Sequence, residues 1–466
     1  MKAFYIALAS LIVFTTSGLA NNISVSTATL SGQNTTAHTE IINFNVAWDN
    51  SWRTSTNENN YDGAWIFVKF RKQGTTDWRH CTISGSGSSA ATGATFSVPT
   101  DGKGAFIYRS ANGIGNVSYT GNQLIWNYGA DGILDNETVE IRVFALEMVY
   151  IPSGSFYLGS GGTESYAFSN GSSSAPYLVA DASAITTGTT TGTLNYGSNG
   201  TGSPIPATFP TGFNAFWIMK YEATQQQYAD FLNHIDQARA TVLNTSPASV
   251  TGSHPGFIPV AGERAISQVG YRFNAALADW SGLRPLSELE FEKACRGYNT
   301  PAVPNEYVWG TTTIVPLVTV TNAGLANETV ATPANANANI QSGISQFIRA
   351  GLFARTTGST RELSGGTYYG VMNMGDNVEE ITIFTGSTFG RAINASVHGD
   401  GYLDNDGYTD IAAWRDYRAF GMRGANYVSA LAYARTSDRT NAGYFTSYPS
   451  DNVSAGHGAR LVRTAP

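Results

Sequence analysis

Cysteine is scarce in this sequence. Only two cysteines, Cys81 and Cys295, occur in 466 residues. Exported proteins held together by disulfides are dense in cysteine, so this chain is not a disulfide scaffold. The two residues can either pair or remain as separate buried thiols that pack like small apolar side chains. We favour the second interpretation because they lie far apart in the sequence.

Charge and long apolar runs are also scarce. Charged residues make up 13% of the chain, the formal net charge is −7, and no cluster of five or more Lys or Arg is present. Nucleic acids and anionic membranes are bound by basic clusters, so we expect neither as a partner. Beyond the first 20 residues no stretch is apolar for the ~20 residues that a bilayer-spanning helix needs, so we expect no membrane span.

The N-terminus has the pattern of an export signal. Lys2 precedes the apolar run AFYIALASLIVF over residues 3–14, and Gly18-Leu19-Ala20 is a small-x-small cleavage pattern. A buried N-terminal helix is the alternative, but the cleavage pattern favours a signal peptide over residues 1–20. The 50 glycines and the abundant Tyr, Phe and Trp fit an exported protein. We therefore expect a secreted or cell-surface protein whose signal peptide is cleaved near Ala20.

Residues 21–147 are predicted to form an all-β sandwich of immunoglobulin-like size. Alternating or continuous apolar segments at 42–48, 65–70, 105–108, 124–126 and 139–144 predict short strands. Dipeptides typical of turns separate them, namely Asp62-Gly63, Asp101-Gly102, Asn112-Gly113 and Asp131-Gly132. Residues 160–205 are low in complexity and are predicted to be a surface insertion that is ordered only in part.

Three helices are predicted in the second half of the chain. The first covers 224–233, with Thr224 as N-cap and an apolar stripe three and four residues apart. The second covers 287–295, where Ser287 and Glu290 form a capping box and Gly297 ends the helix. A third covers 270–280. After Gly297 the sequence predicts irregular loops with short strands.

Five segments in order carry a family resemblance. They are MVYIPSGSFYLGS (148–160), FWIMKYEATQQQY (216–228), LRPLSELEFEKACRG (283–297), GVMNMGDNVEE (370–380) and GARLVR (458–463). Together they resemble the signature blocks of the formylglycine-generating, sulfatase-modifying-factor family. The resemblance covers about residues 147–466 and implies the α+β, loop-rich variant of the C-type lectin fold. We therefore predict a β-sandwich over 21–147 followed by a family domain over 148–466.

The family's chemistry is copper-dependent oxidation of a substrate cysteine, and it uses a cysteine pair near the C-terminus. Soft thiolates are the ligands that Cu(I) prefers. The equivalent segment here, RGANYVSALAYAR over 423–435, contains no cysteine. A related branch uses iron held by closely spaced histidines. None of the six histidines here is spaced for that, so we expect neither copper nor iron.

Calcium is the cofactor that the resemblance implies. Matched to the family's calcium loop, Asn373 and Glu380 supply side-chain oxygens, while Asp376 and Val378 supply main-chain carbonyls. Six to eight oxygens suit calcium, although Asp376 replaces the family's glycine. The alternative is a loop with solvated charges. A weaker second site begins at Asn339 and Ile340, but no convincing aspartate follows it.

Two further groups of charged residues allow more than one interpretation. The acidic stretch 398–407 is similar to a calcium loop, but its spacing fails the linear pattern, and a solvated turn is favoured. Four residues, Arg423, Arg435, Asp438 and Arg439, can either line a groove or act as buried structural ion pairs, which is the commoner role.

The sequence therefore supports two functions of different classes. The first is an exported, non-catalytic binding or surface protein on a calcium-stabilised family scaffold, with a glycan, a peptide or an envelope protein as partner. The second is an oxidoreductase of the same family with a displaced metal site. A structural role in an envelope assembly is a third.

Overall fold

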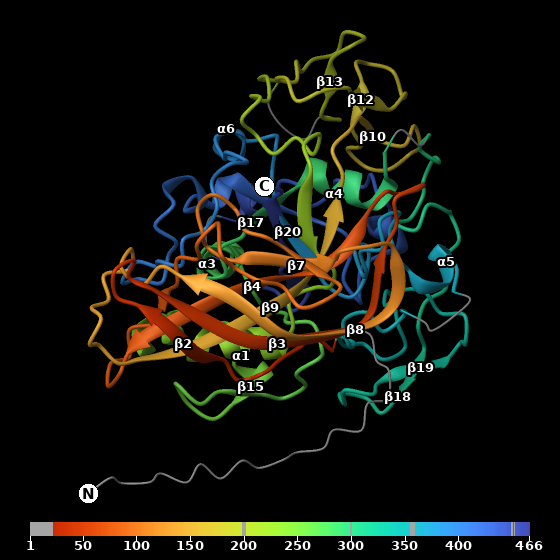
Figure 1. The fold of residues 1–466 in the computed structure, drawn as a ribbon. Helices are drawn as coiled ribbons and strands as arrows, with labels where there is room; N and C mark the ends of the chain where they lie inside the picture. Colours follow the sequence, from red (N-terminus) through yellow and green to blue (C-terminus); the bar gives the residue numbers. More distant parts are fainter. Residues whose placement is uncertain (1–21, 198–201, 299–300, 355–358, 449–450, 452) are drawn as a thin grey trace, which may run out of the picture.

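The computed structural model describes residues 22–197, 202–298, 301–354, 359–448, 451 and 453–466. The predicted signal peptide lies outside these residues. The described chain is mostly β-structure, with one large mixed sheet, four small two-stranded sheets and seven short α-helices (Figure 1). The β-rich character agrees with the predicted fold class.

Nine strands form the N-terminal part of the large sheet. They are β1 (Ser24–Val25), β2 (Thr29–Asn34), β3 (Thr39–Arg53), β4 (Tyr61–Lys72), β5 (Arg79–His80), β6 (Ala94–Ser97), β7 (Ala105–Arg109), β8 (Gly113–Trp126) and β9 (Val139–Ile151). Strand β3 pairs with β8 along most of its length and with β4 only between Arg53 and Tyr61. Strand β4 pairs with β7 and β9.

The remaining strands and helices follow β9. The strands are β10 (Phe156–Leu158), β11 (Ser169–Asn170), β12 (Tyr177–Val179), β13 (Leu194–Asn195), β14 (Phe216–Met219), β15 (Val250–Thr251), β16 (Ile258–Pro259), β17 (Arg284–Ser287), β18 (Thr319–Thr321), β19 (Thr329–Thr332), β20 (Glu379–Ile383), β21 (Phe420–Arg423), β22 (His457–Gly458) and β23 (Leu461–Thr464). The helices are α1 (Gln225–Asn233), α2 (Gln237–Leu243), α3 (Tyr271–Trp280), α4 (Glu288–Arg296), α5 (Arg361–Ser364), α6 (Thr388–Arg391) and α7 (Tyr444–Ser447).

The two halves of the chain share one sheet through β9. Its residues Met148 to Tyr150 pair with β4 on one side and with β14 on the other. The sheet then continues from β14 through β23, β17 and β20 to β21, with β17 and β20 parallel. The domain boundary that the sequence placed after residue 147 therefore falls inside a strand that is paired on both sides. The N-terminal strands do not form a sheet of their own.

Strand β4 is buried on both faces, which explains its continuous apolar sequence. Ala64, Ile66 and Val68 contribute to a hydrophobic cluster with side chains of β3, β7 and β8. The alternate residues Trp65 and Phe67 contribute to a second cluster with side chains of α1, α3 and β14. Because side chains alternate along a strand, β4 forms the common wall of the N-terminal and C-terminal cores.

The three predicted helices are confirmed, as are the caps predicted for the first two. Thr224 caps α1 and forms a capping box with Gln227, and Ser287 forms one with Glu290 at the start of α4. Gly297 ends α4 with a φ of 92°, which favours glycine. Helix α3 follows its predicted range within one residue at its start. Helix α2 was not predicted.

The low-complexity insertion is built mainly from two small sheets, β10 with β12 and β11 with β13. They lie at the top of Figure 1. Phe168, Val179 and Leu194 anchor this segment, since all three are buried in the cluster shared with α1 and α3. The described part of the insertion is therefore fixed to the core by apolar side chains.

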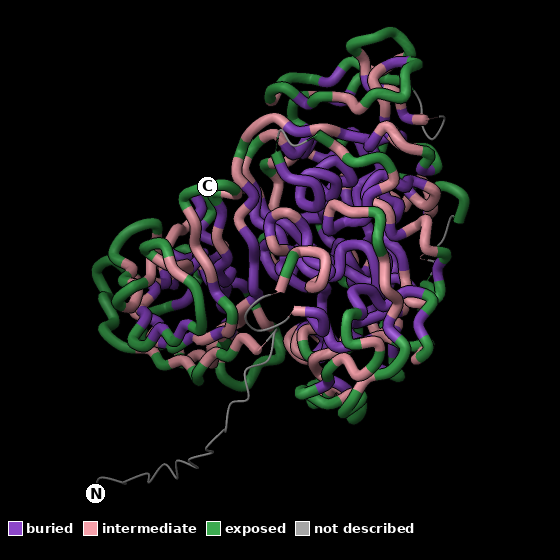
Figure 2. The backbone as a smooth tube through the Cα atoms, turned by 90° about the vertical axis from the view of Figure 1, so that its right-hand side faces the viewer, coloured by how far each residue is buried: buried purple, intermediate pink, exposed green. Residues whose placement is uncertain are grey.

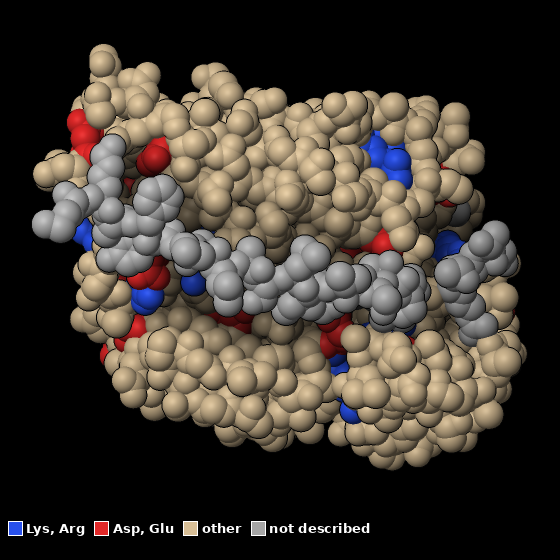
Figure 3. Space-filling view, turned by 60° about the horizontal axis from the view of Figure 1, so that its bottom comes forward, with Lys and Arg blue, Asp and Glu red and all other residues tan. Residues whose placement is uncertain are grey.

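Burial and charge are unevenly distributed. Figure 2 shows buried backbone concentrated inside the larger body, with exposed residues in the surrounding loops. On the face drawn in Figure 3 most of the surface comes from uncharged residues. Among the described residues, none of the helices combines the length and hydropathy that a bilayer-crossing helix needs.

One predicted turn is wrong. Asp62 and Gly63 lie inside β4 rather than between strands. The Asp62 carboxylate is buried and accepts hydrogen bonds from the Trp48 indole, the Ser51 hydroxyl and the Trp52 backbone N–H. A Cβ at Gly63 would approach the Ile107 carbonyl oxygen to 2.7 Å, so close strand packing rather than a turn requires this glycine.

A buried ion triad joins the two halves at this point. The Lys220 ammonium lies 3.0 Å from a carboxylate oxygen of Asp62 on β4 and 3.0 Å from one of Glu147 on β9. All three side chains are almost fully buried. Lys220 belongs to the second family-like segment, so this segment also has a structural role.

We expect Lys220→Met to lower the free energy of unfolding by about 3–5 kcal/mol, because it leaves two buried carboxylates without their cation. Chemical denaturation followed by tryptophan fluorescence measures this loss. The control is Lys72→Met, which removes a half-exposed ion pair with Glu137 and should cost no more than about 1 kcal/mol. Equal effects of the two substitutions would contradict a special role for the triad.

Candidate cation-binding centre and ligand cleft

The predicted calcium loop forms a buried polar turn before β20. Asn373 and Asn377 have φ values of 56° and 72°, a conformation that asparagine tolerates better than most residues. The Asn373 side-chain oxygen accepts from the Gly351 N–H at 2.8 Å, and its amide donates to Asp376 at 3.2 Å. Asp376 in turn accepts from the backbone N–H of Asn339 at 2.6 Å.

Asn377 lies at the middle of the buried polar centre formed by Asn339, Asn373, Asp376 and Glu222, although no pattern in the sequence singles it out. Its side-chain oxygen accepts from the Asn339 amide and from the Ile348 N–H, both at 2.9 Å. Its own amide donates to Glu222 at 2.6 Å. The stronger and weaker predicted calcium sites, around Asn373 and Asn339, therefore lie side by side. Ile340 is fully buried beside them.

The Glu380 carboxylate forms an ion pair with the guanidinium of Arg460. Its Oε1 lies 3.1 Å from the guanidinium of Arg460, which also donates to the carbonyl oxygens of Met219 and Met372. Burial raises the pKa of Glu380 to about 8, although Arg460 opposes this shift. Burial also raises the pKa of Asp376 to about 6 and that of Glu222 well above its ordinary value.

Two oxygen atoms near this loop are available to a hard cation. Three buried carboxyl groups, those of Glu222, Asp376 and Glu380, lie within electrostatic reach of the Arg460 guanidinium. The Oε2 atom of Glu380 and the side-chain oxygen of Asn339 are buried and have no hydrogen-bond partner among the described residues. Oxygens without partners in an acidic centre are the ligands that calcium takes. The Asn373 side-chain oxygen is less suited to this role, because it already accepts from Gly351.

Arg423 and Arg439 lie inside the protein as ion-pair residues, the second of the two roles that the sequence left open, and not along a groove. Both side chains are completely buried, and they pair with Glu288 and Glu292 of α4. Although burial opposes ionisation, these arginines hold the pKa of Glu288 below its ordinary value, and Arg423 with Arg296 does the same for Glu292. The pairs fasten α4 to β21 and the following loop, so they are structural.

The other two predicted groove residues lie close to this network. The guanidinium of Arg435 donates to Asn305 at 3.1 Å. Asp438 is 6% exposed and accepts the backbone N–H of Thr440. Among the residues that the structure describes, neither Arg435 nor Asp438 forms an ion pair, so no ligand site is defined here.

Both cysteines are free and buried, as expected. Cys81 belongs to the N-terminal cluster, and Cys295, a residue of α4, belongs to a different cluster with side chains of β9 and β14. Burial raises the pKa of each thiol well above its ordinary value. Neither thiol is therefore a reactive, exposed thiolate.

A cleft of about 360 Å³ lies between the N-terminal strands and helices α1 and α3. Its walls include the aromatic rings of Phe67, Phe144 and Trp280, which contact one another at centroid distances of 5.0–5.1 Å. Its polar lining residues are Arg142, Gln227, Asp230, His234 and Ser281. Sequence reasoning missed this cleft because its walls come from separate segments between residues 23 and 461.

Two titratable groups in the cleft are shifted towards their neutral forms. Burial, assisted by the positive charge of Arg142, lowers the pKa of His234 to about 4. Burial raises the pKa of Asp230 to about 6. The His234 ring nitrogen Nδ1 is hydrogen-bonded to the Asp230 carbonyl oxygen at 2.7 Å. A neutral imidazole beside apolar rings suits an uncharged, hydrogen-bonding ligand.

We expect the contribution of Glu380 to the free energy of unfolding to fall as pH rises from about 5 to 8 in metal-free buffer. In this window folded Glu380 keeps a proton that the unfolded chain has released, so rising pH favours unfolding. Glu380→Gln should make the fall shallower, whereas Asp406→Asn, at an exposed carboxylate, should not. Denaturation curves at several pH values measure the slopes, and an unchanged slope for Glu380→Gln would refute the assignment.

Comparison with known sequences assigns the chain from β9 to β23 to a family. Residues 138–464 match the model of a family described as sulfatase-modifying factor enzyme 1-like domain. The match begins immediately before β9 and ends at the last residue of β23, so it contains the whole centre around Glu380. A search of curated protein sequences finds no significant match. Because the match covers well over half of its length, the chain belongs to the sulfatase-modifying factor family.

Proposed function

We propose that this chain is an exported, non-catalytic binding protein that uses the family scaffold to present a ligand cleft. The observation that carries the proposal is the state of its thiols. Segment 423–435, which corresponds to the family's redox segment, contains no cysteine, and the two cysteines of the chain are buried in different clusters. Thiol oxidation needs an accessible thiolate, and neither residue offers one.

The cleft between the N-terminal strands and α1 and α3 is the proposed binding site. Its volume lies in the range typical of small-ligand sites. Aromatic rings form its walls, and side chains that can donate and accept hydrogen bonds are placed among them. A sugar ring has an apolar face and a rim of hydroxyl groups, so the end of a glycan is the ligand that matches this lining.

Calcium at the centre around Glu380 is proposed to be structural. Glu380 and the main-chain carbonyls of Asp376 and Val378 would hold it, and the cation would neutralise the excess charge of the buried carboxyl groups. Such a cation would fix the loop between β19 and β20 without taking part in a reaction.

We expect both thiols to resist a thiol-specific reagent such as dithionitrobenzoate while the protein is folded, and both to react once guanidinium unfolds it. Copper added under reducing conditions should bind only substoichiometrically, as measured by elemental analysis. The Cys81→Ala/Cys295→Ala variant is the control, and it should retain as little copper as the wild type. Rapid reaction of a folded thiol, or cysteine-dependent copper, would instead favour the oxidoreductase alternative.

We expect the wild type to bind particular glycans on an array, and Arg142→Ala/Asp230→Ala to reduce that signal by about tenfold or more, since it removes two polar groups of the cleft. The matched control, Arg418→Ala/Asp416→Ala, removes the same residue types from an exposed ion pair elsewhere. Binding that survives in the cleft variant would contradict this site. The absence of binding to any glycan would contradict the ligand class.

A further inference from the structure

The buried triad of Asp62, Glu147 and Lys220 places a primary amine against a carboxyl group. The Lys220 Nζ lies 3.0 Å from the Oδ2 atom of Asp62 and 3.0 Å from the Oε2 atom of Glu147. A third acceptor is the carbonyl oxygen of Asn50 at 3.4 Å. Only 4% of the lysine side chain and 0% of the aspartate side chain is exposed. The amine therefore meets the carboxyl group at a point that bulk water does not reach.

The strand order explains why these side chains meet. Strand β9 lies between β4 and β14, and Lys220 directly follows β14, where its backbone N–H donates to the Glu147 carbonyl at 2.9 Å. Glu147 is paired with Ala64 on β4. Asp62 lies two residues before Ala64, so Asp62 and Glu147 point to the same face of the sheet. The lysine and the aspartate thus approach Glu147 from opposite sides of β9.

Hydrogen bonds hold the Asp62 carboxyl group in one orientation. Its Oδ1 atom accepts the Ser51 hydroxyl at 2.8 Å and the Trp52 backbone N–H at 3.0 Å. Its Oδ2 atom, which faces Lys220, accepts the Trp48 indole N–H at 3.0 Å. Two donors on Oδ1 would stabilise the negative charge that forms there when an amine adds to the carboxyl carbon. Asp62 is therefore positioned as an electrophile, with Oδ2 as the oxygen that leaves.

Glu147 has the features of a proton shuttle. One of its oxygens accepts from Lys220, whereas its Oε1 atom is buried and has no hydrogen-bond partner among the described residues. Burial raises the pKa of Glu147 to about 7, although Lys220 opposes this shift. Burial opposes ionisation of Lys220, but Tyr221 and the two carboxylates raise its pKa well above the ordinary value. The amine therefore becomes a nucleophile only when a neighbouring carboxylate takes its proton, and Glu147 can do so near neutral pH.

The surroundings favour the loss of charge. The centroids of the Trp52 and Tyr221 rings lie 5.0 and 5.4 Å from the Lys220 Nζ. Keeping an ammonium and two carboxylates in such a place carries a desolvation penalty. An amide between Lys220 and Asp62 would remove one charge of each sign and would keep the hydrogen bonds to Oδ1. Proximity helps as well, since groups fixed in contact react as if highly concentrated.

We propose that Lys220 and Asp62 form an intramolecular isopeptide bond, with Glu147 as the proton shuttle. The neutral Nζ attacks Cγ of Asp62, the C–N bond forms, and the bond between Cγ and Oδ2 breaks. Of the three ammonium protons, one stays on the amide nitrogen and two leave with Oδ2 as water. Glu147 carries these protons and ends as it began. The step consumes one ammonium and one carboxylate and uses no oxidant, reductant or co-reactant.

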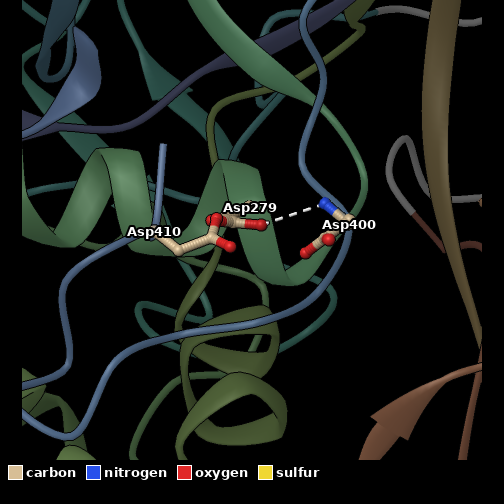
Figure 4. A group of neighbouring side chains, drawn as sticks. All are labelled: Asp279, Asp400 and Asp410. Carbon is tan, nitrogen blue, oxygen red and sulfur yellow. Dashed lines mark hydrogen bonds between the residues drawn. The ribbon is translucent and has the colours of Figure 1, made fainter. Parts of the chain in front are cut away.

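Lys69 shows that burial and nearby aspartates are not sufficient for such a bond. It is fully buried on β4, and burial lowers its pKa to about 7 against the opposing charges of Asp279 and Asp400. Figure 4 shows the carboxylates of Asp279 and Asp410 facing each other, with Asp400 beside them. The Lys69 Nζ has no hydrogen-bond partner among the described residues, so it touches none of these carboxyl groups. Lys69 therefore serves as an internal reference for Lys220.

The bond would join the two halves of the chain covalently. It would link β4 to the segment after β14 across 158 residues. A cross-link of this kind restricts the unfolded chain as a disulfide does, but a reductant would not open it. The ion triad is the state that precedes the bond. The proposal is independent of the proposed binding function, and its failure would leave the triad, the cleft and the centre around Glu380 as described.

The mass of the purified chain, measured by electrospray after unfolding in acid, tests the proposal. We expect a mass lower than that of the sequence by one water molecule. A tryptic digest should yield a branched peptide that contains both Asp62 and Lys220, because trypsin does not cleave after an acylated lysine. Cleavage after Lys69, at the end of the same peptide, should be normal. A wild type of full sequence mass without this branched peptide would overturn the proposal, whatever the variants do.

Three variants identify the groups that react. Glu147→Gln keeps both reacting residues and should retain its full sequence mass, because a glutamine side chain does not accept the proton. Lys220→Met should also retain its full mass, which separates the isopeptide bond from dehydration of Asp62 onto its own backbone. The matched control Glu137→Gln, in a half-exposed ion pair elsewhere, should lose water like the wild type. A fully cross-linked Glu147→Gln chain would overturn the role of Glu147, and water loss that persists in Lys220→Met would overturn the bond.

Discussion

The structure depends on a single shared strand. Residues 148–150 of β9 are hydrogen-bonded to β4 on one side and to β14 on the other, so the backbone polar groups of both halves are satisfied by the same segment. An unpaired central strand edge is costly and prone to aggregate, which makes the N-terminal strands part of the fold rather than an attachment. Strand β4 reinforces this dependence, because its two faces belong to different cores.

Charge is scarce in the sequence, and much of it lies inside the protein. Among the described residues of the family domain, seven buried arginine and lysine side chains form ion pairs, namely Lys220, Arg284, Arg296, Arg423, Arg439, Arg460 and Arg463. Each meets a carboxylate of another element or loop, or of its own helix. In a fold with so much irregular backbone, buried ion pairs fix geometry that helices and sheets do not.

The proposed sites differ in their position in the fold. The centre around Glu380 is internal to the family domain, and its acidity is enclosed on all sides. The aromatic cleft lies at the junction with the N-terminal strands and needs residues from both halves. The N-terminal strands therefore supply part of the wall of a cleft that the family domain alone would leave open. This arrangement suits a protein whose surface, rather than a redox centre, carries its function.

The sequence by itself determined what depends on local pattern. The capped helices α1 and α4, the strands of the first half, the buried thiols and the family membership all follow from contiguous segments, because capping, alternation and motif spacing act over a few residues. Tertiary structure alone decided the rest. Asp62-Gly63 became strand instead of turn because a buried lysine 158 residues away neutralises the aspartate. Arg423 and Arg439 became structural ion pairs because α4 presents Glu288 and Glu292 to them. Asp279 joined Asp400 across 121 residues through a backbone hydrogen bond. Electrostatic partners are chosen by proximity in space, and no local pattern encodes that proximity.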